Sequence, residues 1–166
     1  MTAPDYEIAL ATADDIPGIV ALQQANLINN GGFLSIEFSR TWFECVLSEM
    51  PIIVARKRGL IVGYLVSSPL SVAAHAPLIH AKLRAYPGSI DPYNHGPVCI
   101  AKDERNQGLI ARMFEALRER LKGREGIAFV RRDNAASLSA HAKLGMRQVA
   151  KFEHDGVPYV VVAYIA

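Results

Sequence analysis

The chain has 166 residues, of which 51% are hydrophobic and 20% charged, and its formal net charge is +2. This composition is typical of a globular protein, and the length suits a single domain over residues 1–166. A nearly neutral charge with scattered arginines gives no argument for a nucleic-acid partner. Residues 1–15 lack an apolar signal segment, and no run approaches the ~18 apolar residues of a membrane span. We therefore expect a cytoplasmic protein with no membrane partner.

The first third of the chain predicts a strand followed by two helices. Residues 6–10 alternate weakly, as in a strand, and Thr12 with Asp15 three positions later is a capping-box pattern that begins a helix. Residues 29–32 (Asn-Asn-Gly-Gly) end this helix. The loop then places apolar Phe33 and Leu34 among polar residues, as either a plain connector or the wall of a ligand pocket. A second helix is predicted over residues 39–50.

The middle of the chain predicts a hairpin and then a less regular stretch. Residues 51–55 and 60–66 form two strands joined by the basic turn 56–59. Residues 69–95 contain a helical pattern that Pro77 interrupts, and residues 87–97 are rich in turn signals. His75, His80 and His95 lie here without metal-ligand spacing and are interpreted as surface or pocket residues. Cys45 and Cys99 are interpreted as buried free thiols, and no metal site is predicted.

The last part of the chain alternates strands and helices. Strands are predicted at residues 98–101, 127–130, 146–152 and 159–165, with helices from residue 109 and over residues 135–144, where Gly145 is the C-terminal cap. The apolar last strand could pair across a homodimer or lie centrally in its own sheet. The element order predicts a mixed α/β sheet with helices on both faces.

A strand–turn–helix segment at residues 98–114 predicts an anion site. Free N–H groups and the helix dipole attract anions there, Arg105 adds positive charge, and Gly108 has no Cβ to block a phosphate. The segment resembles the pyrophosphate loop of the GCN5-related N-acetyltransferases (the GNAT family), R/Q-x-x-G-x-G/A. Arg105 and Gly108 occupy the first two marked positions, while the third is Ile110, followed by Ala111.

A second segment resembles the other motif of this family, N-x-x-A-x-x-x-Y-x-x-x-G-F. Asn134 and Gly145 match it, Ser137 replaces a small residue, and His141 stands where tyrosine is usual. Met146 replaces the final aromatic residue. Two motifs in the right order are more specific than either alone. The resemblance covers residues 95–165, and extends to the first half only in the order of its elements.

The resemblance implies a GNAT-like acyl-CoA N-acyltransferase fold with two central strands that splay apart. It implies acetyl-CoA as the acyl donor, with no metal, and direct attack by a primary amine in a ternary complex. The pantetheine arm would lie along Val98, Cys99 and Ile100 and meet Asn134 and Ser137. The pyrophosphate would lie on the loop formed by Arg105, Asn106, Gln107, Gly108, Leu109, Ile110 and Ala111.

Catalytic roles carry over only in part. His141 is the candidate for protonating the leaving thiolate by its position, with Tyr159 or Tyr164 as alternatives. His95 is the candidate general base, with Asp91 and Glu37 as alternatives. An acceptor amine of low pKa would need no base. Cys99 is disfavoured as a nucleophile because apolar surroundings raise a thiol pKa.

The acceptor is predicted from a few apolar side chains. Phe33, Leu34 and Tyr93, with Trp42, favour a small-molecule amine such as an amino-acid derivative, and a protein amine is the alternative. The departures at Ile110 and His141 keep open a non-catalytic acyl-CoA sensor. A different nucleotide-binding α/β protein is disfavoured, because the dinucleotide fingerprint and a Walker lysine are missing.

Overall fold

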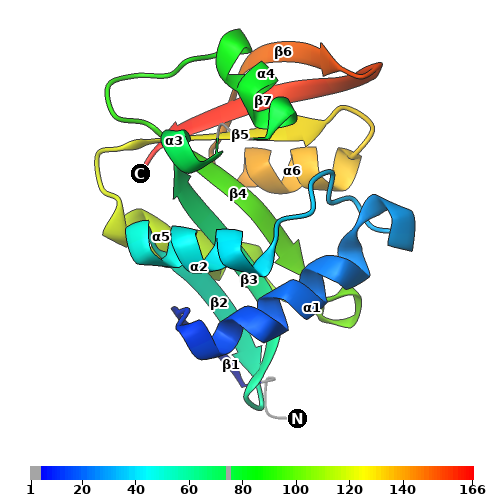
Figure 1. The fold of residues 1–166 in the computed structure, drawn as a ribbon, viewed down its shortest axis with the longest axis vertical. Coiled ribbons are helices and arrows are strands. Elements are labelled where there is room, and N and C mark those ends of the chain that lie inside the picture. Colours follow the sequence, from blue (N-terminus) through cyan, green and yellow to red (C-terminus); the bar gives the residue numbers. More distant parts are fainter. Residues whose placement is uncertain (1–4, 74–75) are drawn as a thin grey trace. The chain divides into compact units, whose positions relative to one another are not determined.

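The computed structural model describes residues 5–73 and 76–166 and contains seven strands with helices between them (Figure 1). The strands are β1 (Tyr6–Leu10), β2 (Ile52–Lys57), β3 (Leu60–Pro69), β4 (Tyr93–Ile100), β5 (Glu125–Arg131), β6 (Arg147–His154) and β7 (Val157–Ile165). The α-helices are α1 (Ile16–Asn26), α2 (Arg40–Glu49), α3 (Leu70–Ala73), α4 (Pro77–Ala85), α5 (Leu109–Arg120) and α6 (Ala135–Lys143).

The strand order β1-β2-β3-β4-β5-β7-β6 confirms the predicted mixed sheet. Strands β4 and β5 run parallel, whereas β1 with β2, β2 with β3, β5 with β7 and β6 with β7 are antiparallel. The register of β4 on β5 pairs Tyr93 with Gly126 and Asn94 with Ile127. The splaying of these two strands beyond that point stays a prediction.

The described residues form two compact units, and each is considered by itself. The first unit contains residues 5–67 and 96–120, and the second contains residues 68–95 and 121–166 apart from the two that are not described. Because β3 and β4 each pass from one unit to the other, both units contain part of the sheet. The single domain expected from the sequence stays a prediction.

In the first unit, helices cover both faces of β1–β3. Helices α1 and α2 lie in front of the strands in Figure 1 and α5 lies behind them. Phe43 of α2 packs edge-on against Tyr64 of β3, with ring centroids 6.1 Å apart. The predicted capping box is present, since the Thr12 N–H donates to Asp15 Oδ2 at 2.8 Å, and a 3-10 turn over Ala13–Asp15 leads into α1.

In the second unit, α4 and α6 cover opposite faces of the sheet. Lys82 of α4 bonds Asn94 of β4, while the ring of His141 on α6 lies near that of the next residue, His95. Successive side chains of a strand point to opposite faces. The two helices are therefore separated by the sheet, and each face of β4 meets a different helix.

Of two predictions in the middle of the chain, one was wrong and one is confirmed. Strand β4 begins at Tyr93, within the stretch expected to be turns, because Tyr93, Asn94 and His95 are all buried and bond side chains of this unit. The predicted interruption at Pro77 is confirmed, since α3 ends at Ala73 and Pro77 begins α4, where a missing N–H costs little in the first turn. His75 lies outside the described residues.

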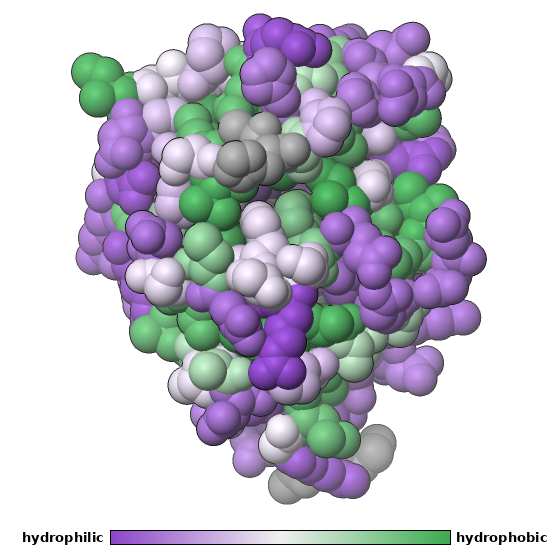
Figure 2. All heavy atoms as spheres, viewed as in Figure 1, coloured by the Kyte–Doolittle hydropathy of each residue, from purple (hydrophilic) through white to green (hydrophobic). Residues whose placement is uncertain are grey.

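Cys99 is buried as expected, but Cys45 is exposed. Helix α2 buries Phe43 and Val46, and Cys45 lies on its outer side. Figure 2 shows hydrophilic residues spread over the viewed face with hydrophobic residues between them. Among the described residues, no helix has the length and apolarity needed to cross a membrane.

Candidate active site

The predicted phosphate loop lies at the start of α5 in the first unit. Residues 105–108 are exposed and Leu109 is the first helical residue. Asn106 and Gly108 have left-handed φ angles of 61° and 72°. A Cβ built on Gly108 would meet nothing within 4 Å. Glycine is therefore needed here for its backbone conformation, and the space beside it is open to a ligand.

Arg105 ties this loop to two other elements of the first unit. Its Nε donates to the carbonyl oxygen of Ile100 at 3.3 Å, and its Nη2 donates to Asn26 Oδ1 at 2.9 Å. The guanidinium is planar with five N–H donors, so these two bonds fix its plane. Neither bond uses the N–H groups of Nη1. Arg105 is thus oriented before any anion binds.

Asn26 also holds the loop that contains Phe33 and Leu34. Its side-chain Nδ2 donates to Leu22 O at 2.9 Å, and its backbone carbonyl accepts from Leu34 N at 3.1 Å. A Cβ on Gly32 would lie 1.9 Å from that carbonyl oxygen. The loop therefore packs tightly on the end of α1, and Phe33 itself remains 54% exposed.

The segment Val98, Cys99 and Ile100 forms the last part of β4. Burial raises the pKa of the Cys99 thiol to about 12, although Arg105 and Tyr64 act in the opposite direction. A thiol with this pKa is protonated near neutral pH and is a poor nucleophile. The geometry is consistent with a structural side chain on a strand whose backbone is the expected ligand contact.

A cluster of tyrosine and histidine side chains occupies the α6 face of the second unit. The Tyr164 hydroxyl lies 2.5 Å from the Tyr93 hydroxyl and 2.8 Å from His95 Nδ1. Tyr93 and Tyr164 both pair with Gly126, one from each side, so the three residues form a row across β4, β5 and β7. The glycine leaves room for the two hydroxyl groups to meet above it.

His141 of α6 lies beside this cluster. Its ring centroid is 6.2 Å from that of His95, and its Nδ1 is 2.7 Å from the Ser137 carbonyl oxygen and 3.2 Å from Ser137 Oγ. A carbonyl oxygen only accepts, so Nδ1 carries a proton and the lone pair of the neutral ring is at Nε2. This arrangement suits a proton acceptor better than the donor role that the sequence suggested.

Burial keeps both histidines uncharged. Desolvation holds the pKa of His95 well below its usual value, and the charges of His141 and Lys82 lower it further. Desolvation also lowers the pKa of His141, while its bond to the Ser137 carbonyl opposes this effect. Near neutral pH both rings are neutral, so each can accept a proton.

Asn134 and Ser137 are adjacent at the start of α6. Asn134 Oδ1 accepts from Ser137 N at 3.1 Å and caps the helix. Among the described residues, its side-chain NH₂ has no hydrogen-bond partner. The side chain is therefore fixed by the cap, and its NH₂ group is available to donate.

Tyr159 and Tyr164 lie on opposite faces of the sheet. Tyr159 stacks on Phe152 with ring centroids 5.1 Å apart and packs edge-on against Phe129. Phe129 in turn lies 6.0 Å from Lys82 Nζ, on the α4 face. Of the two tyrosines considered as donors, only Tyr164 joins the histidine cluster.

The other candidate bases lie at the surface, each in its own unit. Glu37 bonds Gln24, and Asp91 pairs with Arg124 at 3.3 Å. Tyr93, predicted to contact the acceptor, is fully buried within the histidine cluster. Within the parts of the chain that the structure describes, no group of three or more His, Cys, Asp or Glu side chains could hold a metal ion.

Sequence reasoning missed Asn26, Gly126 and Lys82. In the sequence, Asn26 has the pattern of an ordinary helix end. Gly126 was expected to end a helix, whereas in the structure it is a strand residue that faces the ring of Tyr164. Lys82 lies in a weak helical pattern and is fully buried. Its placement between apolar positions 79 and 83 was the one signal that could have identified it.

Comparison with known proteins places this fold among acetyltransferases. No family model matches the chain, and no curated protein matches its sequence. Many solved structures match the chain. A GNAT-family acetyltransferase from Streptococcus agalactiae is 18% identical with a TM-score of 0.72, covering 97% of this chain and 95% of that one.

Two others have similar scores. A ribosomal-protein-alanine N-acetyltransferase from Brucella melitensis is 23% identical, with a TM-score of 0.69 over 96% of this chain and 99% of that one. A structure from Salmonella typhimurium that contains acetyl-CoA as its cofactor is 16% identical, with a TM-score of 0.69 over 97% of this chain and 94% of that one. The chain therefore has the GNAT acetyltransferase fold.

Proposed function

We propose that this chain is a GNAT-family enzyme that transfers the acetyl group of acetyl-CoA to a primary amine. The observation that carries the proposal is the buried bond between Tyr164 and His95, beside neutral His141, in a fold that acetyltransferases share. These are groups that can accept and donate protons during acyl transfer. A protein that only binds acyl-CoA has no need of them.

The residues fit acetyl-CoA as the acyl donor. In the first unit, residues 105–111 would bind the pyrophosphate through the free N–H groups at the start of α5 and through Arg105 Nη1. In the second unit, the NH₂ group of Asn134 would donate to a pantetheine carbonyl oxygen. A neighbour of this fold that contains acetyl-CoA supports the same choice of donor.

The reaction forms a bond between the amine nitrogen and the acetyl carbonyl carbon, breaks the carbon–sulfur bond, and moves one proton from the amine. We propose that His141 Nε2 accepts the amine proton, in place of the donor role that the sequence suggested. The Tyr164 hydroxyl donates a proton to the leaving thiolate and is reprotonated from solvent through its bonded partners Tyr93 and His95, while His141 releases the amine proton to solvent, so that in total one proton passes from the amine to the sulfur. Such proton transfers contribute about 10²–10⁴-fold in rate.

For the acceptor we propose a small molecule with an apolar portion, such as an amino-acid derivative. Phe33, exposed on a loop held by Asn26, is the apolar group that supports this choice. The alternative is the N-terminal amine of a protein. It is favoured by two neighbours of this fold that are named as ribosomal-protein-alanine N-acetyltransferases.

The test is a panel of acceptors with acetyl-CoA, with acetylated products identified by mass spectrometry. The panel contains amino-acid amides, arylalkylamines, polyamines and peptides with free N-termini. Turnover of aryl or amino-acid amines supports the proposal, while turnover of peptides alone selects the protein-amine alternative. Tight binding of acetyl-CoA without any product would contradict catalysis and favour a sensor.

Tyr164→Phe and Tyr159→Phe form a matched pair for the proton donor. Both remove one hydroxyl group from β7, but only Tyr164 contacts His95. We expect Tyr164→Phe to lower kcat by about 10²-fold or more and Tyr159→Phe to leave it nearly unchanged. Equal losses in the two variants would remove Tyr164 from the mechanism.

A further inference from the structure

Lys82 is a fully buried lysine on α4, with 0% of its surface exposed. Lysine is almost never fully buried unless its amine is paired. Its Nζ donates to Asn94 Oδ1 and to the carbonyl oxygen of Ile127, the latter at 3.1 Å, and it lies 6.0 Å from the Phe129 ring centroid. Burial lowers the pKa of this amine to about 7.

No carboxylate pairs with Lys82 among the residues that the structure describes. An amine placed among neutral groups costs free energy that an apolar side chain of similar length would not. Its two acceptors, however, match the two N–H groups that remain even when the amine is neutral. The bonds of Lys82 therefore persist in both protonation states, which suggests that their geometry is what the residue provides.

The two acceptors are register partners on neighbouring strands. Asn94 of β4 pairs with Ile127 of β5, so a single amine joins the two strands at one level of the sheet. Asn94 is also held from its other side, since its Nδ2 donates to Ser68 Oγ at the end of β3 at 3.3 Å. Lys82 thus bonds β4 and β5 at the same level of the sheet.

The residue after Asn94 is His95, whose side chain points to the opposite face. There, His95 Nδ1 lies 2.8 Å from the hydroxyl of Tyr164, and Tyr164 pairs with Gly126, the residue before Ile127. A displacement of β4 along β5 would change this distance directly. The charge of Lys82 also lowers the pKa of His95, so the two groups are coupled electrostatically.

We propose that Lys82 is a positioning residue that holds His95 in hydrogen-bond contact with Tyr164 by fixing Asn94 of β4 to Ile127 of β5. Its importance for catalysis rests on the proposed function, in which His95 and Tyr164 transfer a proton. The positioning itself does not rest on that function and is measured without any substrate.

The experiment is NMR of the histidine ring nitrogens in the full chain, with His95 assigned from the spectrum of His95→Gln. Lys82→Met removes the amine and keeps the length of the side chain. We expect it to shift the Nδ1 resonance of His95, because the contact with Tyr164 is loosened. Lys151→Met is the matched control, since it removes the same charge from an exposed position on β6 of the same unit.

A folded Lys82→Met variant whose His95 Nδ1 resonance coincides with that of Lys151→Met would overturn the proposal. If Lys82→Met does not fold, Lys82→Met/Asn94→Leu replaces both bonded side chains by apolar ones and restores packing. The same shift is expected in this double variant, and an unchanged His95 would overturn the proposal equally.

Kinetic measurements distinguish the positioning role of Lys82 from the proposed acetyltransferase function. If acetyl transfer is established, Lys82→Met is expected to lower kcat by more than it changes the KM for acetyl-CoA, because its bonded partners Asn94 and Ile127 are not among the residues proposed to bind acetyl-CoA. A shifted His95 in a protein that does not acetylate amines would leave the positioning intact and reject only the proposed function.

Discussion

The ring of Tyr164 lies directly against Gly126: a Cβ built on this glycine would stand 2.5 Å from Tyr164 Cζ and 2.7 Å from its hydroxyl oxygen. The two residues are also register partners on β7 and β5. The hydroxyl that bonds His95 therefore reaches its place only because residue 126 has no side chain.

Gly126→Ala should displace Tyr164 from His95. Overpacking of this kind costs about 1–3 kcal/mol of stability, and we expect kcat for acetyl transfer to fall with it. Thermal unfolding and steady-state kinetics measure the two effects. Adding Tyr164→Leu, which lacks the clashing atoms, should recover stability without recovering activity. A Gly126→Ala variant with unchanged stability would show that the ring has room to move.

Acid should destabilise the fold through its two buried histidines. The folded-state pKa values of His95 and His141 are lowered, so below the unfolded value of about 6.5 the unfolded chain binds more protons. Stability should be complete above that pH and fall as the pH drops below it, by up to about 1.4 kcal/mol per pH unit for each ring. Urea unfolding from pH 7 to 5 measures this slope. It should be smaller in His141→Gln, and an equal slope in the variant would contradict the assignment.

Lys82 should make the stability of the fold depend on pH over a higher pH range than the two histidines do. Its pKa is about 7 in the folded chain and about 10.4 in the unfolded chain, so between these values the unfolded state binds the extra proton. Stability relative to Lys82→Met should therefore rise with pH from about 7 to about 10. Urea unfolding of both proteins at pH 7.5 and 9.5 tests the sign. A difference that does not change with pH would mean that Lys82 has an ordinary pKa in the fold.

Binding of CoA at the phosphate loop should stabilise the loop that contains Phe33. Arg105 bonds Asn26 Oδ1, and the backbone of Asn26 accepts from Leu34, so CoA should slow amide hydrogen exchange over residues 27–38. Asn26→Leu should remove this protection. Gln24→Ala is the control, because Gln24 joins α1 to Glu37 without contacting Arg105. Equal loss of protection in both variants would contradict a path through Asn26.

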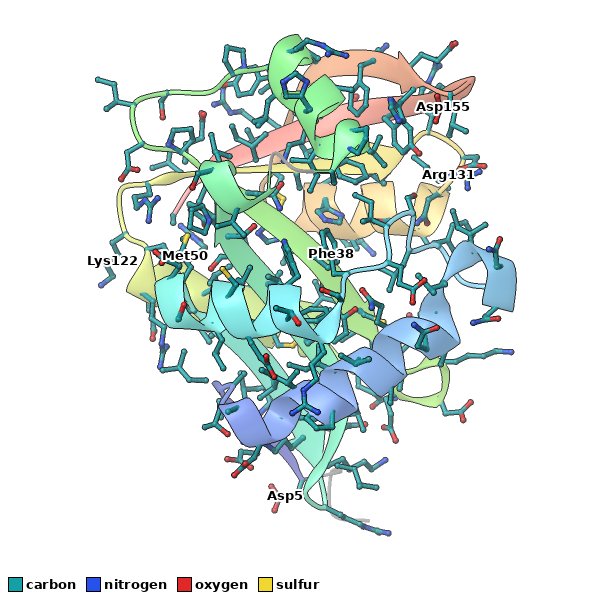
Figure 3. The ribbon with its side chains drawn as sticks, in the orientation of Figure 1. Asp5, Phe38, Met50, Lys122, Arg131 and Asp155 are labelled. Atoms are coloured by element: carbon teal, nitrogen blue, oxygen red, sulfur yellow. The ribbon has the colours of Figure 1, made fainter. Side chains whose placement is uncertain are left out.

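Phe38, labelled in Figure 3, gives a second readout of that loop. The side-chain amide of Gln23 bonds the backbone of Phe38 twice: Gln23 Nε2 donates to the Phe38 carbonyl oxygen at 2.8 Å, and Phe38 N donates to Gln23 Oε1 at 2.9 Å. The ring of Phe38 stacks on Trp42 with centroids 3.8 Å apart. Trp42 is the only tryptophan of the chain. A change in its fluorescence on addition of CoA should therefore accompany the change in hydrogen exchange.

Periodicity and caps predicted most elements of this fold. The capping box at Thr12, the stripe of α5 and the turn between β6 and β7 are local patterns, and local patterns are visible in a sequence. The start of β4 was missed because Asn94, Gly96 and Pro97 favour turns. Its strand conformation depends on partners remote in sequence, namely Lys82, Ile127 and Tyr164.

The site was predictable only to the level of motifs. The loop around Gly108 and the pair Asn134 with Ser137 follow from the family resemblance. Tyr159 and Tyr164 are an odd number of positions apart, which already places them on opposite faces of a strand. Which face holds the histidines depends on the register of three strands, and no sequence pattern reports it.

The most direct test of the account is calorimetric titration of acetyl-CoA into the wild type, Gly108→Asp and Gly108→Asn. Both substitutions impose the same strain at a left-handed φ of 72° and add side chains of equal size into open space. They differ in charge alone. We predict that the wild type and Gly108→Asn bind acetyl-CoA, while the carboxylate of Gly108→Asp repels the pyrophosphate and abolishes binding. Equal affinity in the two variants, or no binding by the wild type, would contradict the assignment of this loop to acetyl-CoA.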